Sequence, residues 1–154
     1  MKKRYQKLLT LLLITSIGFV GISACFSGPL LIIDPSGMII EFPGGTLDNT
    51  PFSSFLIPGI ILTFIIGLYP LLVTLWLLFP KMLHISFKSS LQPRWYAAMS
   101  VGIAIIIFII AQLILIQEKM FLQDVYLLTG LFICTVCLLP AIRNYYSNEK
   151  RSVS

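Results

Sequence analysis

The sequence predicts an all-α membrane protein, a four-transmembrane-helix bundle formed by a single domain that covers residues 1–154. The first observation behind this prediction is composition: 57% of the residues are hydrophobic and only 11% are charged, whereas about a quarter are charged in an ordinary soluble domain. The second is that the charged residues leave four long apolar runs, and about 20 apolar residues suffice to cross a hydrocarbon core of about 30 Å. Backbone amides within that core must bond internally, so each run is predicted to be a helix. The predicted helices cover approximately residues 8–27, 55–79, 95–117 and 122–144.

The distribution of basic residues predicts the orientation of these helices. With the N-terminus in the cytoplasm, every lysine and arginine except Lys119 lies on the cytoplasmic side, as is typical of membrane proteins. These cytoplasmic cations are Lys2, Lys3, Arg4, Lys7, Lys81, Lys88, Arg94, Arg143, Lys150 and Arg151. The net charge of +5 is therefore explained by topology rather than by nucleic-acid binding. We expect a multi-pass protein of the bacterial cell (inner) membrane with both termini in the cytoplasm, whose partners are membrane lipids and another membrane protein or a second copy.

Residues 28–54, between the first and second predicted helices, form the one substantial loop on the outer side. Within it, Asp34-Pro35-Ser36-Gly37 suits a type I turn, with aspartate first, proline second and glycine fourth. Apolar segments rich in isoleucine flank this turn on both sides. We therefore predict a short outer loop that resembles a β-hairpin. Its acidic residues, Asp34, Glu41 and Asp48, are typical of a solvated surface rather than of a metal site.

Small residues recur at helical spacing in three of the predicted helices, where they would let neighbouring backbones approach closely. They are Gly18, Gly21 and Cys25 in the first helix, Ala98 and Gly102 in the third, and Gly130, Cys134, Cys137 and Ala141 in the fourth. In the second helix, Pro70 is expected to produce a kink because it removes one backbone hydrogen bond. Polar side chains at membrane depth are expected to form hydrogen bonds between helices; these are Thr63, Thr74, Ser100, Gln112 and Thr135.

Cys134-Thr135-Val136-Cys137 is the strongest chemical motif in the sequence, because two thiols at this spacing can cycle between dithiol and disulfide. A redox pair normally has its first thiol at a helix N-terminus in contact with water, where the thiol pKa is lowered. Cys134 and Cys137 lie in the middle of a predicted transmembrane helix instead. The motif is therefore open to two interpretations, close packing between helices and redox chemistry.

Cys25 has a second interpretation. Residues 1–7 are basic, residues 8–21 are apolar, and Ile22-Ser23-Ala24-Cys25 resembles the cleavage motif of a bacterial lipoprotein signal. Cleavage before Cys25 would leave a lipidated protein with three helices. The segment that follows Cys25 is apolar rather than a polar tether, which favours retention of the first helix.

Three segments carry a resemblance to a known group of proteins. They are Asp34-Pro35-Ser36-Gly37, Thr50-Pro51-Phe52-Ser53-Ser54-Phe55-Leu56-Ile57-Pro58-Gly59 and Leu139-Pro140-Ala141-Ile142-Arg143-Asn144-Tyr145-Tyr146. In this combination the chain resembles uncharacterised small bacterial four-helix integral membrane proteins over nearly its whole length. The resemblance implies that the first helix is kept, and it implies no established activity.

The residues point to no catalytic, cofactor-binding or metal-binding set, and we expect no cofactor. The leading hypothesis is a non-enzymatic accessory or structural component of the membrane that works through helix packing or through its outer loop. One alternative is a membrane thiol oxidoreductase that uses Cys134 and Cys137. Another is a small permease or ligand binder gated near Pro58 and Pro70.

Overall fold

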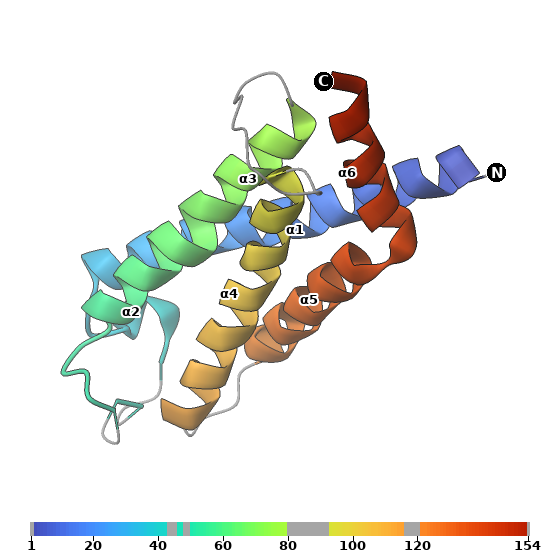
Figure 1. The fold of residues 1–154 in the computed structure, drawn as a ribbon. Coiled ribbons are helices and arrows are strands. Elements are labelled where there is room, and N and C mark those ends of the chain that lie inside the picture. The colour runs from blue at the N-terminus through green and yellow to red at the C-terminus, as the bar shows by residue number, and fades with distance from the viewer. Residues whose placement is uncertain (1, 43–45, 48–49, 80–92, 116–120, 154) are drawn as a thin grey trace.

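The computed structural model describes residues 2–42, 46–47, 50–79, 93–115 and 121–153, and this part of the chain is helical, without strands (Figure 1). Four helical stretches are long and apolar enough to cross a membrane, which confirms the predicted fold class. The elements are α1 (Lys2–Ile33), the 3-10 turn η1 (Met38–Ile40), α2 (Leu56–Ile61), the π-helix η2 (Leu62–Leu68), α3 (Tyr69–Leu78), α4 (Pro93–Leu115), α5 (Phe121–Leu138) and α6 (Pro140–Val153). Segments α2, η2 and α3 form one continuous helical span.

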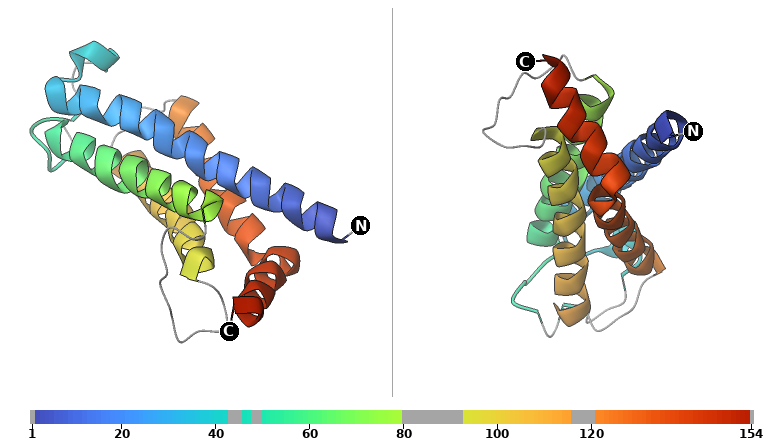
Figure 2. Two further views of the ribbon diagram at one scale, coloured as in Figure 1. Left: turned by 90° about the horizontal axis from the view of Figure 1, so that it is seen from above. Right: turned by 45° about the vertical axis from the view of Figure 1, so that its right-hand side comes forward.

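The four spans form two closely packed pairs. Helix α1 lies along α2, η2 and α3, while α4 lies along α5, and the contacts between the two pairs are less extensive (Figures 1 and 2). Aliphatic side chains from both pairs fill the centre, including the fully buried Ile17, Ile66, Ile105 and Ile133. We call the end of the bundle that holds the start of α1 and all of α6 the N-terminal end. The opposite end, where the connection between α1 and α2 lies, is called the cap end.

The outer surface of the spans is apolar, as expected for a surface that contacts lipid rather than water. Phe26 of α1 is 76% exposed, Ile107 of α4 is 63% exposed and Leu128 of α5 is 66% exposed. Water-soluble monomers rarely expose contiguous apolar surface on this scale. The central contacts and the outer surface of the spans are therefore both built from apolar residues.

The β-hairpin-like loop predicted for residues 28–54 is wrong. Helix α1 continues past its predicted end to Ile33, passes through Pro29, and takes up the first isoleucine-rich flank. The second flank contributes the 3-10 turn Met38–Ile40. The turn between the flanks is confirmed, because the N–H of Gly37 donates to the carbonyl oxygen of Asp34 at 3.1 Å. A short apolar run is compatible with the end of a helix as well as with a strand, and its sequence pattern alone does not distinguish these two structures.

Two prolines shape the later spans. The predicted fourth helix, 122–144, is divided, because α5 ends at Leu138 and α6 starts at Pro140. Proline lacks an N–H and its ring crowds the preceding turn, so it fits the start of a new helix better than the interior of an old one. Pro70 does not end its span. It is the second residue of α3, just after the π-helical stretch η2, a wider helical turn that accommodates the missing bond.

Candidate functional site

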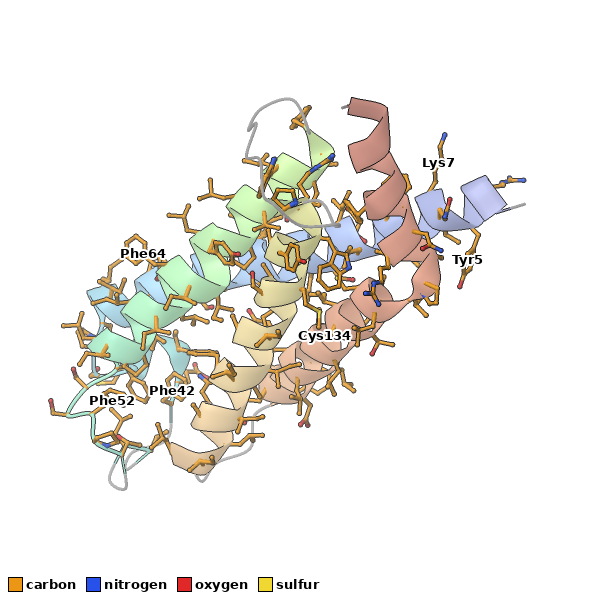
Figure 3. All side chains as sticks on the ribbon, viewed as in Figure 1. Tyr5, Lys7, Phe42, Phe52, Phe64 and Cys134 are labelled. Carbon is orange, nitrogen blue, oxygen red and sulfur yellow. The ribbon has the colours of Figure 1, made fainter. Side chains whose placement is uncertain are left out.

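The predicted redox pair lies in the contact between α4 and α5. The Cys134 thiol faces Gly102, because a Cβ added to that glycine would lie only 2.7 Å from Cys134 Sγ. Cys137 is fully buried, and its carbonyl oxygen accepts a hydrogen bond of 2.9 Å from Nε1 of Trp95. Both thiols are free (Figure 3 labels Cys134). The geometry gives the pair a place in helix packing, and the redox role stays a prediction.

Cys25 lies on the face of α1 that contacts η2. Its Sγ is 3.9 Å from the carbonyl oxygen of Thr63, and a Cβ added to Gly67 would lie 2.7 Å from the same sulfur. In the intact chain this half-buried thiol therefore belongs to the α1 contact with the second span. Lipidation at Cys25 stays a prediction of the sequence.

Two hydroxyl pairs connect the two helix pairs. Ser23 of α1 and Tyr126 of α5 lie 2.7 Å apart, oxygen to oxygen, and Tyr69 of α3 and Ser100 of α4 lie 2.6 Å apart. The prediction of interhelical bonding therefore holds for Ser100. The threonines differ, since the hydroxyls of Thr63, Thr74 and Thr135 donate to carbonyls of their own helices. A hydroxyl in a helix has a backbone carbonyl one turn away, so a local bond needs no neighbour.

Arg94 was predicted only as a cytoplasmic cation, but it is 8% exposed at the start of α4. Its guanidinium carbon lies 5.9 Å from the ring centroid of Tyr146, a residue of α6 that is itself buried. On the other side of α6, Nε2 of Gln6 donates to the carbonyl oxygen of Ala141 at 3.1 Å. Helix α6 is thus fastened to both α1 and α4. Sequence reasoning missed this, because the polar run after Pro140 carries no span signal.

The connection between α1 and α2 forms a built structure that we call the cap, residues 34–42, 46–47 and 50–55. The Asp34 carboxylate accepts hydrogen bonds from the Ser36 hydroxyl, from the Ser36 N–H at 3.2 Å and from the Ile39 N–H at 2.8 Å. Gly37 adopts φ of 78°, a left-handed conformation that suits glycine, and the rings of Phe42 and Phe55 pack against it.

Aromatic stacking and one backbone bond close the cap. The Phe42 and Phe55 rings are parallel within 13°, with centroids 4.5 Å apart. The N–H of Phe55 donates to the carbonyl oxygen of Pro35 at 2.8 Å, joining the two ends of the connection. On this framework the side chains of Met38 and Ile39 remain 76% and 56% exposed. The cap therefore holds two apolar side chains outward on a fixed backbone.

Acidification is expected to loosen the cap. Hydrogen bonds from the Ser36 hydroxyl and from the Ile39 and Ser36 N–H groups hold the pKa of Asp34 below its ordinary value of 3.8. A carboxylate with a lowered pKa in the folded state stabilises that state above its unfolded pKa, and the effect is lost as pH falls through the lowered value. Hydrogen-exchange protection of the Ile39 N–H should therefore drop below pH 3.8. Asp34→Asn should show weaker protection and no such transition, whereas an unchanged transition in this variant would contradict the assignment.

Metal binding has no support in the described residues, because no group of three or more histidine, cysteine, aspartate or glutamate side chains gathers there. Asp48 of the acidic trio lies outside the described part, while Asp34 is engaged in the cap turn.

No protein-family model, curated protein or solved structure matches this chain. The resemblance to uncharacterised bacterial four-helix membrane proteins thus stays an expectation, with which the four apolar helices agree. In the part of the chain that the structure describes, the fold is all-helical, and four of its helical stretches are long and apolar enough to span a membrane, as expected of a membrane protein.

Proposed function

We propose that the chain is a non-enzymatic accessory or structural component of the bacterial inner membrane, and that it binds another membrane protein or a second copy of itself through the cap. The observation that carries the proposal is the cap itself. Its backbone is fixed by the Asp34 hydrogen bonds and the Phe42–Phe55 stack, yet the side chains of Met38 and Ile39 are exposed. Apolar side chains presented on an ordered backbone are typical of contact surfaces, since little conformational entropy is lost on binding.

The interior of the bundle supports a scaffold role. Tyr126 and Tyr69 use their hydroxyls to connect the helix pairs, and Trp95 uses its indole N–H to reach the neighbouring backbone. Cys134 fills the space beside Gly102. These polar and polarisable groups stabilise the arrangement of helices, as such groups do in membrane bundles.

The distribution of charge predicts how the protein is oriented in the membrane. Among the described residues, the basic side chains lie toward the N-terminal end, namely Arg4 and Lys7 at the start of α1, Arg94 at the start of α4 and Arg143 in α6, so the positive-inside rule puts that end in the cytoplasm and the cap on the outer side. A partner would then bind the cap at the outer face of the membrane.

Site-specific photocrosslinking in native membranes tests the proposal. A photoreactive amino acid at Met38 is expected to yield a discrete protein adduct, either with a second copy or with one partner. The matched control is Leu122, which is 59% exposed near the start of α5, at the same end of the bundle. Adducts with lipid alone at Met38, or the same protein adducts at both positions, would contradict a cap-specific contact.

A paired substitution gives an independent check. Met38→Ser together with Ile39→Ser should abolish co-purification of the crosslinked partner from mild detergent while the thermal unfolding midpoint stays unchanged, because both side chains are exposed. Undiminished co-purification would show that the helices, rather than the cap, carry the contact.

A further inference from the structure

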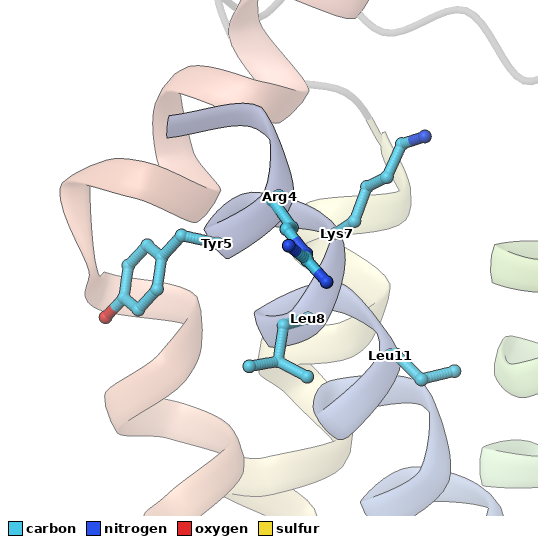
Figure 4. A pocket seen from close by; sticks show the side chains of 5 residues that line it. All are labelled: Arg4, Tyr5, Lys7, Leu8 and Leu11. Carbon is cyan, nitrogen blue, oxygen red and sulfur yellow. The ribbon is translucent and has the colours of Figure 1, made fainter. Parts of the chain in front are cut away.

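The first three turns of α1 carry a groove that the cap-based proposal does not use. Its volume is about 610 Å³, and it is lined by Arg4, Tyr5, Lys7, Leu8 and Leu11 (Figure 4). Arg4, Lys7, Leu8 and Leu11 follow one another at spacings of three, one and three residues, which puts them on the same side of the helix. This part of α1 extends away from the rest of the bundle, as Figure 2 shows.

The opposite side of the same turns is fixed against the protein. Leu9 is 8% exposed and Leu13 is fully buried, while the Gln6 side chain donates to the carbonyl oxygen of Ala141 in α6. The rotation of α1 about its axis is therefore set by packing. The grooved side consequently faces outward in a defined orientation, with the side chains of Tyr5, Leu8 and Leu11 more than half exposed.

The chemistry of the groove changes along the helix axis. Arg4 and Lys7 are exposed cations, and neither has an ion-pair partner among the described residues. Leu8 and Leu11 are 54% and 55% exposed. At a rise of about 1.5 Å per residue, Leu11 lies about 10 Å further along the axis than Arg4, in the direction of the membrane core. Tyr5, 54% exposed, sits at the cationic end, where amphipathic rings commonly mark a membrane interface.

This order of groups is complementary to a phospholipid. A phosphate that lies between Arg4 and Lys7 would leave the attached acyl chains to run along Leu8 and Leu11, parallel to α1. We propose that the groove binds one anionic phospholipid from the leaflet at the N-terminal end, with Arg4 and Lys7 on its phosphate and Leu8 and Leu11 on its acyl chains. Two uncompensated cations favour a lipid with net negative charge over a zwitterionic one, since the choline of the latter would be repelled.

Native mass spectrometry of the full-length protein in mild detergent tests this proposal with defined lipids. Phosphatidylglycerol is expected to form a one-to-one adduct, and phosphatidylcholine is expected to bind at least about tenfold more weakly. The double variant Arg4→Gln, Lys7→Gln should lose the preference for phosphatidylglycerol. Arg143→Gln is the matched control, because Arg143 is an exposed cation of α6 at the same end of the bundle but outside the groove.

A second variant tests the apolar half of the site and keeps the charges. Leu8→Ser together with Leu11→Ser should weaken phosphatidylglycerol binding, and Arg4→Lys with Lys7→Arg should preserve it. Equal binding of the two lipids, full binding by the glutamine variant, or an equal loss with Arg143→Gln would overturn the proposal. Displacement of the lipid by millimolar inorganic phosphate would also overturn it, because it would assign the cations to a free anion. The cap plays no part in these measurements, so their outcome is separate from that of the proposed function.

Discussion

Replacement of Gly28 by alanine is expected to disrupt the packing of α1 against the second span, with a loss of about 3 kcal/mol in the free energy of unfolding. A Cβ at this position would lie 2.8 Å from the backbone nitrogen of Thr63 and 2.9 Å from its Cα. Backbone atoms cannot rotate aside as a side chain does, so the two helices would have to separate. That separation would weaken dispersion contacts along the whole interface.

Gly18→Ala on the same helix is the matched control. Its added Cβ would lie 3.4 Å from Cγ2 of Thr74, close to ordinary contact distance and against a side chain. Alanine is also the better helix former, by about 1 kcal/mol in water. Unfolding of both variants by titration with a denaturing detergent should show a large loss for Gly28→Ala and a change within about 1 kcal/mol for Gly18→Ala. Equal effects at the two positions would contradict the close approach of α1 and η2.

Gly102→Ala is expected to destabilise the α4–α5 pair, and removal of the Cys134 sulfur is expected to relieve part of that effect. The added Cβ would lie 2.7 Å from Cys134 Sγ, but also 3.1 Å from the carbonyl oxygen of Gly130. We therefore expect Gly102→Ala alone to lose about 2 kcal/mol. In a double-mutant cycle, Cys134→Ala should recover about 1 kcal/mol of it.

This cycle also separates the two interpretations of the thiols. If Cys134 serves packing, the coupling energy between positions 102 and 134 is clearly different from zero, and the Cys134→Ala, Cys137→Ala variant keeps every thiol-dependent property of the cells that express it. A coupling energy near zero, together with a redox defect in the double-alanine variant, would favour the thiol oxidoreductase hypothesis instead.

The spans were predictable because their signal is local and strong. Long runs without charge have one stable solution in hydrocarbon, and each predicted helix overlaps an apolar helix of the structure, although the ends differ. The ends were less predictable, since Leu30–Ile33 and residues beyond Pro140 are ambiguous when read alone. Whether an apolar run extends α1 or forms a strand depends on its neighbours. In this chain, Leu31 packs close to Gly59 of α2, which favours the helix.

The candidate sites, like the helices, were only partly predictable from the sequence. The turn at Asp34 to Gly37 follows from residue types alone, and so does the clustering of small residues at helical spacing. The pairing of Ser23 with Tyr126, the burial of Arg94 beneath Tyr146 and the groove along Arg4 to Leu11 depend on how distant helices are placed. A single sequence gives the side chains available for such contacts, but not the partner that each one meets.

Accessibility labelling in intact bacterial cells tests the central claim, a chain that crosses the membrane four times with its cap and its termini on opposite sides. Single cysteines at Ile39 in the cap and at Arg143 in α6 are treated with a membrane-impermeant maleimide, and the unsubstituted chain, whose thiols lie within the spans, serves as the blank. The account predicts that Ile39→Cys is labelled in intact cells and that Arg143→Cys is labelled only after the membrane is permeabilised. Labelling of both positions from outside, or of Arg143→Cys alone, would contradict it.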